Sequence, residues 1–391
     1  MLSRIDWVIS NCRLLAGIGA EYEQTQPFAG LTIGTGIHLE PKTVALLLTL
    51  ARGGARVVST GNLNSTQQSA VDHLRAHGLT VIGGPTRDQA VHDADLAEVL
   101  SHRPDLILDN GGDLFARYLE NPYEGLRGGT EETTSGRARL ALLRDQLAMP
   151  VLVINDSPIK QFAENRHAVG QSVLESLMRI TNLVTNGRRV TVFGYGSCGK
   201  GVALNLRNAH AVVTVVESDP VLRLEALLDG FLVTSREEAL SSADVVITVT
   251  GAGDVVTAAD LDLFRDDVIL ANAGHFPIEI DVPGLRSDAR VTGVTAYSDG
   301  IEVLELADGR ALRVLGEGHM VNLTGPRPLG NSLESMDLGF ALQARCLEAV
   351  ARGAVDGASC VVPVPADIDA RVADDYVTGV TGAPSLLTAA G

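Results

Sequence analysis

Basic residues are scarce in this sequence. Its 391 residues include 31 Lys and Arg against 48 Asp and Glu, which gives a formal net charge of −17. Proteins that bind DNA or RNA need a basic surface, so this charge argues against a nucleic-acid partner. A single nucleotide held by local groups remains compatible with an acidic surface. We therefore expect a small molecule, and no nucleic acid, as the ligand.

Paired cysteines and long apolar runs are missing too. The four cysteines are scattered, and none forms a CxxC pair: Cys12, Cys198, Cys346 and Cys360. This spacing indicates neither a metal site nor a disulfide framework and fits a reducing compartment. Apolar runs such as "VALLLTLA" are too short to span a membrane, and Asp6 comes too early for a signal peptide. We expect a cytoplasmic protein without a membrane partner.

Strand-like and helical patterns alternate in the first half of the chain. Short apolar runs predict strands, and amphipathic spacing predicts helices between them. Alternation of this kind is typical of a parallel sheet covered on both faces. The predicted strands lie within 31–39, 55–60, 79–84, 105–110 and 150–155, and the predicted helices within 41–54, 67–78 and 132–148.

A second αβ series begins at Arg189, after a predicted connecting helix over 173–187. Its strands are expected within 189–194, 211–217, 230–234, 243–251 and 267–274, followed by a β-hairpin that turns at 307–310. A long amphipathic helix over 332–353 comes near the end. We predict an α/β fold with two doubly wound parallel-sheet domains and the active site in a cleft between them. The substrate domain would cover 1–175, completed by about 320–350, the nucleotide-binding domain 176–315, and a C-terminal segment 350–391.

A glycine-rich loop marks the start of the second series. The stretch "VTVFGYGSCGKGVALNL" places Gly194, Gly196 and Gly199 between a predicted strand and a helix. The first glycine permits a tight turn, the second lets a pyrophosphate approach the backbone, and the third lets the helix pack on the strand. Glu217 ends the following strand, where an acid binds ribose hydroxyls and repels a 2′-phosphate. The pattern predicts a Rossmann domain that binds NAD in preference to NADP.

Six separate blocks, in this order, carry a resemblance to a known family: "DLILDNGGDL", "GGTEETTSGRARL", "VINDSPIKQFAEN", "VFGYGSCGKG", "ANAGHFPIEID" and "GEGHMVNL". Together they resemble S-adenosylhomocysteine hydrolase across nearly the whole chain. The resemblance implies NAD as cofactor and a homo-oligomer, dimer or tetramer. It also implies a reaction in which the ribose 3′-hydroxyl is oxidised, the 5′ substituent is eliminated, water adds to the alkene, and the ketone is reduced again.

The resemblance also implies roles for individual residues. Lys160 would take the 3′-hydroxyl proton, Glu164 and Glu132 would meet the sugar hydroxyls, and His38 and His275 would lie near C5′ and the cofactor. Contacts to NAD would come from Thr133, Thr134, Ser135, Asn165, Ser197 and Asn322, beside the glycines and Glu217. Asn62, Ser65 and Gln67 match a block that supports the site without touching the ligand. No metal is implied.

The departures from the family pattern concern mainly the substrate. Asn110 stands where the family has an aspartate that is a candidate for acid–base work at C4′ and C5′, and an amide cannot titrate. Glu40 replaces a threonine. Lys42 replaces the acceptor that binds the adenine amino group. If Lys42 is directed inward, it would suit a keto oxygen, a carboxylate or a phosphate. If it is directed outward, it would be solvated. The run "TGPRPLGNSLESM" lacks the family's Gly-His-Pro. The C-terminal tail lacks the lysine and tyrosine that reach a neighbouring subunit's NAD in the family, so we expect NAD to be held less tightly.

Three functions are compatible with these observations. The first is an NAD-dependent lyase or dehydratase that oxidises a nucleoside-type sugar, eliminates water or a thiol across C4′–C5′, and serves modified-nucleoside biosynthesis. The second is an ordinary S-adenosyl-L-homocysteine hydrolase. The third is a non-catalytic NAD-binding regulator of a true hydrolase, against which the retained Lys160, His38 and His275 argue.

Overall fold

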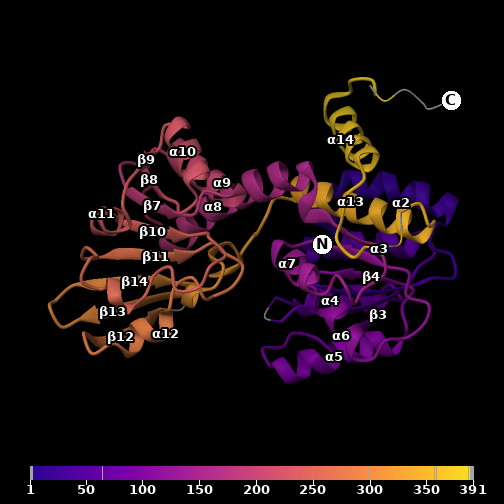
Figure 1. Cartoon of the computed structure of the whole chain (residues 1–391), viewed down its shortest axis with the longest axis horizontal. Coiled ribbons are helices and arrows are strands. Elements are labelled where there is room, and N and C mark those ends of the chain that lie inside the picture. The colour runs from indigo at the N-terminus through magenta and orange to yellow at the C-terminus, as the bar shows by residue number, and fades with distance from the viewer. Residues whose placement is uncertain are drawn as a thin grey trace. The chain divides into compact units, whose positions relative to one another are not determined.

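The chain folds into two units of α/β structure. The computed structural model describes residues 3–63, 65–297, 299–355, 357, 359–385 and 387. Residues 1–161 and 333–391 form the first unit, and residues 162–332 form the second. Each unit contains its own β-sheet (Figure 1). The α/β class predicted from the alternating pattern is therefore confirmed.

The first unit is built on a seven-stranded sheet in the order β15-β6-β5-β4-β1-β2-β3. All of its pairings are parallel. The order reverses between β1 and β4, since β2 and β3 extend the sheet on one side of β1 and the later strands extend it on the other. Such a reversal is where α/β sheets bind ligands. The strands are β1 (Thr32–Ile37), β2 (Arg56–Gly61), β3 (Thr80–Ile82), β4 (Leu106–Asp109), β5 (Gly129–Glu131), β6 (Val151–Val153) and β15 (Val362–Pro363).

Helices cover this sheet. In Figure 1, α2, α3 and α13 lie on one side of it, and α5 and α6 lie on the other. Helix α13 packs against β4 and β5 as well as α3, which explains why most of its residues are buried. The helices are α1 (Arg4–Asn11), α2 (Arg13–Thr25), α3 (Pro41–Arg52), α4 (Gln68–Ala76), α5 (Gln89–Ser101), α6 (Asp113–Glu120), α7 (Thr134–Leu142), η1 (Ile154–Asp156), α13 (Leu333–Ala351) and α14 (Ala366–Thr381).

The second unit has an eight-stranded sheet in the order β12-β13-β14-β11-β10-β7-β8-β9. Its order reverses between β7 and β10. The sheet is mixed rather than wholly parallel, because β13 pairs antiparallel with both β12 and β14. The predicted hairpin is present and joins the sheet through β14. The strands are β7 (Arg189–Phe193), β8 (Val212–Val216), β9 (Leu232–Val233), β10 (Val245–Thr248), β11 (Val268–Asn272), β12 (Val291–Tyr297), β13 (Ile301–Leu306) and β14 (Ala311–Leu315).

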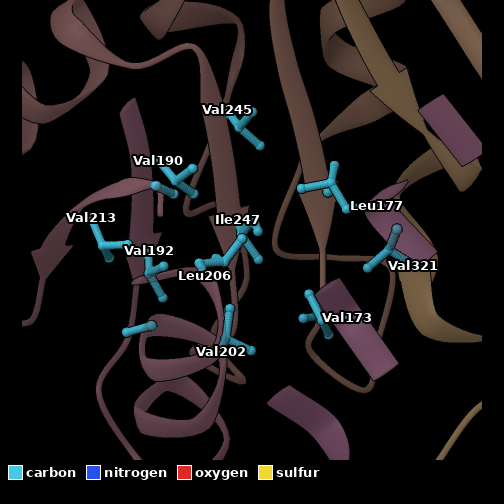
Figure 2. Packing of buried hydrophobic residues seen from close by; sticks show 14 of the residues in the cluster. Val173, Leu177, Val190, Val192, Val202, Leu206, Val213, Val245, Ile247 and Val321 are labelled. Carbon is cyan, nitrogen blue, oxygen red and sulfur yellow. The ribbon is translucent and has the colours of Figure 1, made fainter. Parts of the chain in front are cut away.

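One hydrophobic core of the second unit lies between the parallel strands of its sheet and the helices α8 and α9. Figure 2 shows side chains of β7 and β10, such as Val192 and Ile247, packed against Val202 and Leu206 of α9. Val173 and Leu177 of α8 belong to the same cluster. The helices of this unit are α8 (Val169–Thr181), α9 (Ser197–Asn208), α10 (Pro220–Leu228), α11 (Arg236–Ser242), α12 (Val282–Ser287), η3 (Ala258–Asp260), η4 (Gly316–Gly318) and η5 (Val321–Leu323).

One further helix, η2 (Lys160–Ala168), contains the division between the two units and has π-helical geometry. π-Helical turns are rare and occur frequently at functional sites. The sequence pattern did not predict this geometry. Three of the predicted site residues lie on it: Lys160, Glu164 and Asn165.

Candidate functional site

The loops after β1, β4 and β5 collect most of the predicted substrate residues. His38, Glu40 and Lys42 follow β1, Asn110 follows β4, and Glu132 follows β5. These strands are neighbours in the parallel sheet, so their carboxyl ends meet at one edge. The position is the reversal of strand order in the first unit. The residues therefore lie where this fold binds ligands.

Glu132 is the centre of this group. Its side chain is buried, and each of its carboxylate oxygens has a donor. Lys160 Nζ donates to Oε1 at 3.2 Å, and Asn110 Nδ2 donates to Oε2 at 2.7 Å. Burial alone would raise the pKa of Glu132, but Lys160, His38 and the Asn110 hydrogen bond outweigh it and lower the pKa. Glu132 is therefore an anion that orients two other side chains of the site.

Lys42 lies at the first turn of α3 and is buried, with 5% of its side chain exposed. Its Nζ forms an ion pair with Glu40 Oε1 at 3.1 Å. Of the two directions considered for Lys42, inward or outward, the structure shows the inward one. Burial raises the pKa of Glu40 although Lys42 opposes this, and the Glu132 carboxylate raises it further. The charge of Glu132 therefore acts on the Glu40–Lys42 ion pair.

Asn110 is buried, and only one of its two side-chain polar atoms, Nδ2, has a hydrogen-bond partner in the described part of the chain. Its Nδ2 donates to Glu132, whereas no described residue donates to its Oδ1. The neighbouring Asp109 is directed elsewhere and accepts from the backbone N–H groups of Leu114 and Phe115 at the start of α6. Burial and the Glu131 carboxylate raise the pKa of Asp109 well above its usual value. Asn110 therefore contributes an acceptor at the edge of the sheet.

His38 is held by a residue that the sequence pattern gave only a supporting place. Its Nδ1 lies 2.5 Å from Ser65 Oγ, and Ser65 Oγ also donates to the carbonyl of Asn62 at 3.3 Å. Asn62 Nδ2 donates to the carbonyl of Asn110 at 3.1 Å. The loop after β2 thus ties together the carboxyl ends of β1 and β4.

The three hydroxyl residues assigned to NAD lie at the start of α7 in the first unit. Thr133 is the N-cap residue: its hydroxyl accepts from the Gly136 N–H at 2.8 Å and donates to Glu131 at 2.8 Å. Thr134 donates to Asn155, and Ser135 lies 3.1 Å from the Thr133 hydroxyl. Their contacts with NAD remain predictions.

The glycine loop of the second unit lies between β7 and α9, at the other reversal of strand order. Gly194 has φ +98°, and a Cβ at Gly199 would lie 2.1 Å from the Gly194 carbonyl oxygen. A Cβ at Gly196 would meet no protein atom within 4 Å, so this glycine borders open space at the start of α9. Ser197 is the first residue of α9. The three glycines thus have the separate roles that a pyrophosphate site requires.

Glu217 follows β8 and faces this loop. Its carboxylate accepts from the N–H of Tyr195 at 2.6 Å and from the N–H groups of Ser218 and Asp219. The acid predicted to bind the ribose hydroxyls is therefore placed beside the second residue of the glycine motif. The geometry fits a dinucleotide, whose adenosine ribose would meet Glu217.

A chain of hydrogen bonds in the second unit joins two further site residues. Asn331 Nδ2 donates to Glu164 Oε1 at 3.4 Å, Ser172 Oγ donates to Asn331 Oδ1 at 3.2 Å, and Asn322 Nδ2 donates to Ser172 Oγ at 3.2 Å. Asn322 Oδ1 is buried and has no hydrogen-bond partner among the described residues. Sequence reasoning missed Ser172 and Asn331. The chain brings the predicted sugar ligand Glu164 and the predicted nicotinamide ligand Asn322 into one network.

His275 is exposed and follows β11. Its loop is fixed by Asn272, whose Nδ2 donates to the carbonyls of Gly274, Phe276 and Gly318. The His275 ring contacts the Phe276 ring edge-on, with centroids 4.6 Å apart. Its role at the cofactor remains a prediction.

The fold and the glycine loop define a dinucleotide-binding α/β protein with a separate, side-chain-rich site in its first unit. Residues 10–121 match the family model "S-adenosyl-L-homocysteine hydrolase", and residues 165–327 match "S-adenosyl-L-homocysteine hydrolase, NAD binding domain". The chain belongs to the S-adenosyl-L-homocysteine hydrolase family and is an enzyme of the adenosylhomocysteinase type that uses NAD.

Individual relatives agree with this assignment. Adenosylhomocysteinase of Thermotoga maritima is 41% identical over 95% of this chain and 92% of its own length. The S-inosyl-L-homocysteine hydrolase of Methanopyrus kandleri is 39% identical over 95% of this chain and 88% of its length. A protein of the same name from Methanothermobacter thermautotrophicus is 40% identical over 87% of this chain and 83% of its length. In the described part of the chain, no helix is both long and apolar enough to cross a membrane.

Proposed function

We propose that this protein is an NAD-dependent hydrolase that splits an S-nucleosyl-L-homocysteine into homocysteine and a nucleoside, and that the nucleoside carries a 6-oxopurine base. We favour hydrolysis over the lyase or dehydratase reaction because two of the relatives and both family models are named as homocysteine hydrolases. The observation that supports a 6-oxopurine base is the buried Lys42, which is paired with Glu40.

NAD, when bound, would supply the acceptor for the hydride of C3′ of the ribose and the donor that returns it at the end of the cycle. Lys160, in its amine form, takes the proton of the 3′-hydroxyl, and the Glu132 anion stabilises the resulting ammonium group. Glu132 also keeps Lys160 in place. Asn322 would bind the nicotinamide carboxamide through its unpartnered Oδ1, and Glu217 would bind the ribose of the adenosine half.

The base assignment follows from donor and acceptor chemistry. Adenine presents an amino group that donates, whereas a 6-oxopurine presents a carbonyl oxygen that accepts at the same position. Lys42 has three donors and no acceptor, and the resemblance places it where the family reads that position. Glu40, as an acceptor beside it, suits the N1–H of a 6-oxopurine. A buried ammonium facing the adenine amino group would leave donors unpaired at a cost of about 1–3 kcal/mol.

The test compares two substrates with the purified protein and NAD. S-inosyl-L-homocysteine and S-adenosyl-L-homocysteine are supplied separately, thiol release is followed colorimetrically, and the nucleoside product is identified by mass. We expect kcat/KM to favour the inosyl substrate about 10- to 100-fold, the ratio that corresponds to one unpaired buried donor or acceptor. Lys42→Gln should narrow this ratio, since glutamine offers an acceptor as well as donors.

Arg52→Gln is the matched control, because Arg52 is a cation at the other end of α3 with half of its side chain exposed. It should leave the ratio unchanged. Equal or higher kcat/KM for the adenosyl substrate would reject the base assignment but keep the hydrolase. Accumulation of a nucleoside lighter by one water would instead support the lyase. An absence of NAD reduction with every substrate would favour the regulator.

A further inference from the structure

Helix α14 has no part in the reaction proposed above. It is the last helix in the described part of the chain and packs against α13 and α2 (Figure 1). Its first turn contains two acidic residues, Asp367 and Asp369. Asp367 is exposed, whereas Asp369 is partly buried and accepts a hydrogen bond from Ser157 Oγ at 2.5 Å. Ser157 lies between β6 and η2, so this contact joins the C-terminal helix to the segment that carries Lys160.

Ser157 caps the helix on which Lys160 stands. The two residues before η2 are helical, which makes Ser157 the N-cap residue and places Pro158 at the favoured first helical position. Ser157 Oγ accepts from the N–H of Ile159 at 3.1 Å and from the N–H of Lys160 at 3.4 Å. A serine in this position satisfies N–H groups that have no partner within the helix. The backbone of Lys160 is therefore held by the oxygen whose proton goes to Asp369.

The Asp369 carboxylate fixes the orientation of this hydroxyl. A serine hydroxyl has one proton to donate and two lone pairs that accept. Because the proton is donated to Asp369, the lone pairs of Ser157 Oγ stay directed at the two N–H groups. A hydrogen bond to an ionised acceptor is about twice as strong as one between neutral groups. The negative charge also lies beside the N-terminus of a helix, where the helix dipole favours it.

Lys160 is thus held both by its side chain and by its backbone. Its Nζ donates to Glu132 Oε1 at 3.2 Å, and its N–H donates to Ser157. The lysine stem is flexible, so the ion pair with Glu132 alone is compatible with more than one position of the backbone. The cap removes this freedom. All of these residues, including Asp369, belong to the first unit of the chain.

We propose that Asp369 is a positioning residue for the oxidation step: through Ser157 it fixes the first turn of the Lys160 helix, so that α14 helps to hold the reactive amine at the 3′-hydroxyl. The inference rests on the proposed function, in which Lys160 takes the 3′-hydroxyl proton. Asp369 acts through Ser157 and does not itself meet the substrate. The sequence assigned a role to neither residue.

The experiment uses the full-length protein loaded with NAD. Asp369→Ala removes the acceptor, Asp369→Asn keeps an uncharged one, and Ser157→Ala removes the hydroxyl. Substitutions of Asp367 by Ala and Asn are the matched controls, because this carboxylate lies in the same helical turn but is exposed. NADH absorbance is followed after mixing with inosine or adenosine, whichever the native protein oxidises faster. The maximal rate per bound NAD and the half-saturating nucleoside concentration are measured separately.

Asp369→Ala should lower the maximal rate of NAD reduction about 10- to 100-fold, the loss that a displacement of about 1 Å can cause. The half-saturating concentration should stay within about twofold of native, because binding groups are unchanged. Asp369→Asn should lose less, since its amide oxygen still accepts from Ser157. Ser157→Ala should match Asp369→Ala, and the double variant should be no slower than either, as expected for residues that act as one unit. Both Asp367 variants should resemble the native protein.

Equal rates in the Asp369 and Asp367 variants would overturn the proposal. Losses that multiply in the double variant would do the same, as would a raised half-saturating concentration at an unchanged maximal rate. Melting temperatures identify a misfolded variant. If Asp369→Ala misfolds, Asp369→Asn against Asp367→Asn decides, because the amide keeps the shape of the carboxylate. Failure of the proposed function is distinguishable, since the native protein would then reduce no NAD with either nucleoside and release no homocysteine.

Discussion

The two sheets reverse their strand order in the same way but present different chemistry at the reversal. In the first unit, the carboxyl ends of β1, β4 and β5 carry charged side chains that bind each other, such as Glu132 with Lys160 and Glu40 with Lys42. In the second unit, the end of β7 carries glycines, and the carboxylates of Glu217 and Glu279 bind backbone N–H groups. One site is made of side chains and the other largely of backbone.

The difference shows which changes each site tolerates. A site made of backbone groups depends on glycines. A substitution there acts by adding a Cβ that needs space and by restricting the backbone angle φ. A site made of side chains depends on their charges and on where their protons lie. A substitution there therefore changes hydrogen bonding and the dependence of activity on pH. The departures from the family pattern fall mainly in the side-chain site, where one substitution can change what is recognised without changing the fold.

The largest effect should come from Lys160. We expect Lys160→Ala to reduce substrate-dependent NADH formation about 10²- to 10⁴-fold, the usual contribution of a general base, while NAD binding stays close to native. Lys160→Arg is the sharper control, because it can still pair with Glu132 but cannot lose its proton. NADH absorbance after mixing with nucleoside measures both. Native rates in either variant would remove Lys160 from the oxidation step.

The glycines of the second unit should separate fold from cofactor binding. Gly199→Ala places a Cβ 2.1 Å from the Gly194 carbonyl oxygen and should destabilise the unit by about 1–3 kcal/mol. Gly196→Ala meets no protein atom within 4 Å, so it should leave the melting temperature unchanged and weaken NAD binding. Calorimetry and NAD titration test the pair. Identical behaviour of the two variants would contradict the separate roles of the glycines.

Asn110→Asp should convert the first site into a pair of competing carboxylates. The substituted side chain would face Glu132 Oε2 without a donor and should cost about 1–3 kcal/mol at neutral pH. Sharing of one proton raises the pKa of the pair, so stability should return as the pH falls toward 5. Melting temperatures at pH 7 and 5 measure this, with the exposed Asn121→Asp as control. A variant as stable as native at pH 7 would show that the Asn110–Glu132 hydrogen bond contributes nothing.

A smaller pH effect should come from Asp337 in α13, which accepts from the N–H groups of Leu14 and Leu15 at the start of α2. Burial raises its pKa from 3.8 to about 6. The folded protein therefore binds a proton more tightly than the unfolded chain. The resulting stability is present below pH 3.8 and is lost as the pH rises through about 6.

The native protein should consequently gain stability relative to Asp337→Asn when the pH is lowered from 7 to 5. Melting temperatures at pH 7, 6 and 5 give the difference, and Glu124→Gln, at an exposed position of the same unit, serves as control. A constant difference between native and Asp337→Asn across this range would contradict the raised pKa.

Local patterns were sufficient for the longer elements. The predicted strands at 31–39, 105–110, 189–194 and 243–251 and the hairpin turning at 307–310 are present. β5 and β15 were missed because they have only three and two residues. β12 was missed as well, because five of its seven residues are exposed and the other two are only partly buried. Short or exposed strands are defined by their neighbours rather than by their own sequence.

The sequence by itself determined the cofactor loop, because the strand, the three glycines and the first turn of the helix are contiguous and their roles are local. Only the tertiary structure decided the substrate site. Glu132 meets Asn110 across 22 residues and Lys160 across 28. Likewise, only the fold buries Lys42 and brings Ser65 to His38. Glu132 meets Asn110 because β5 lies beside β4, and Ser65 meets His38 because β2 lies beside β1. This strand order is fixed by the packing of the whole unit.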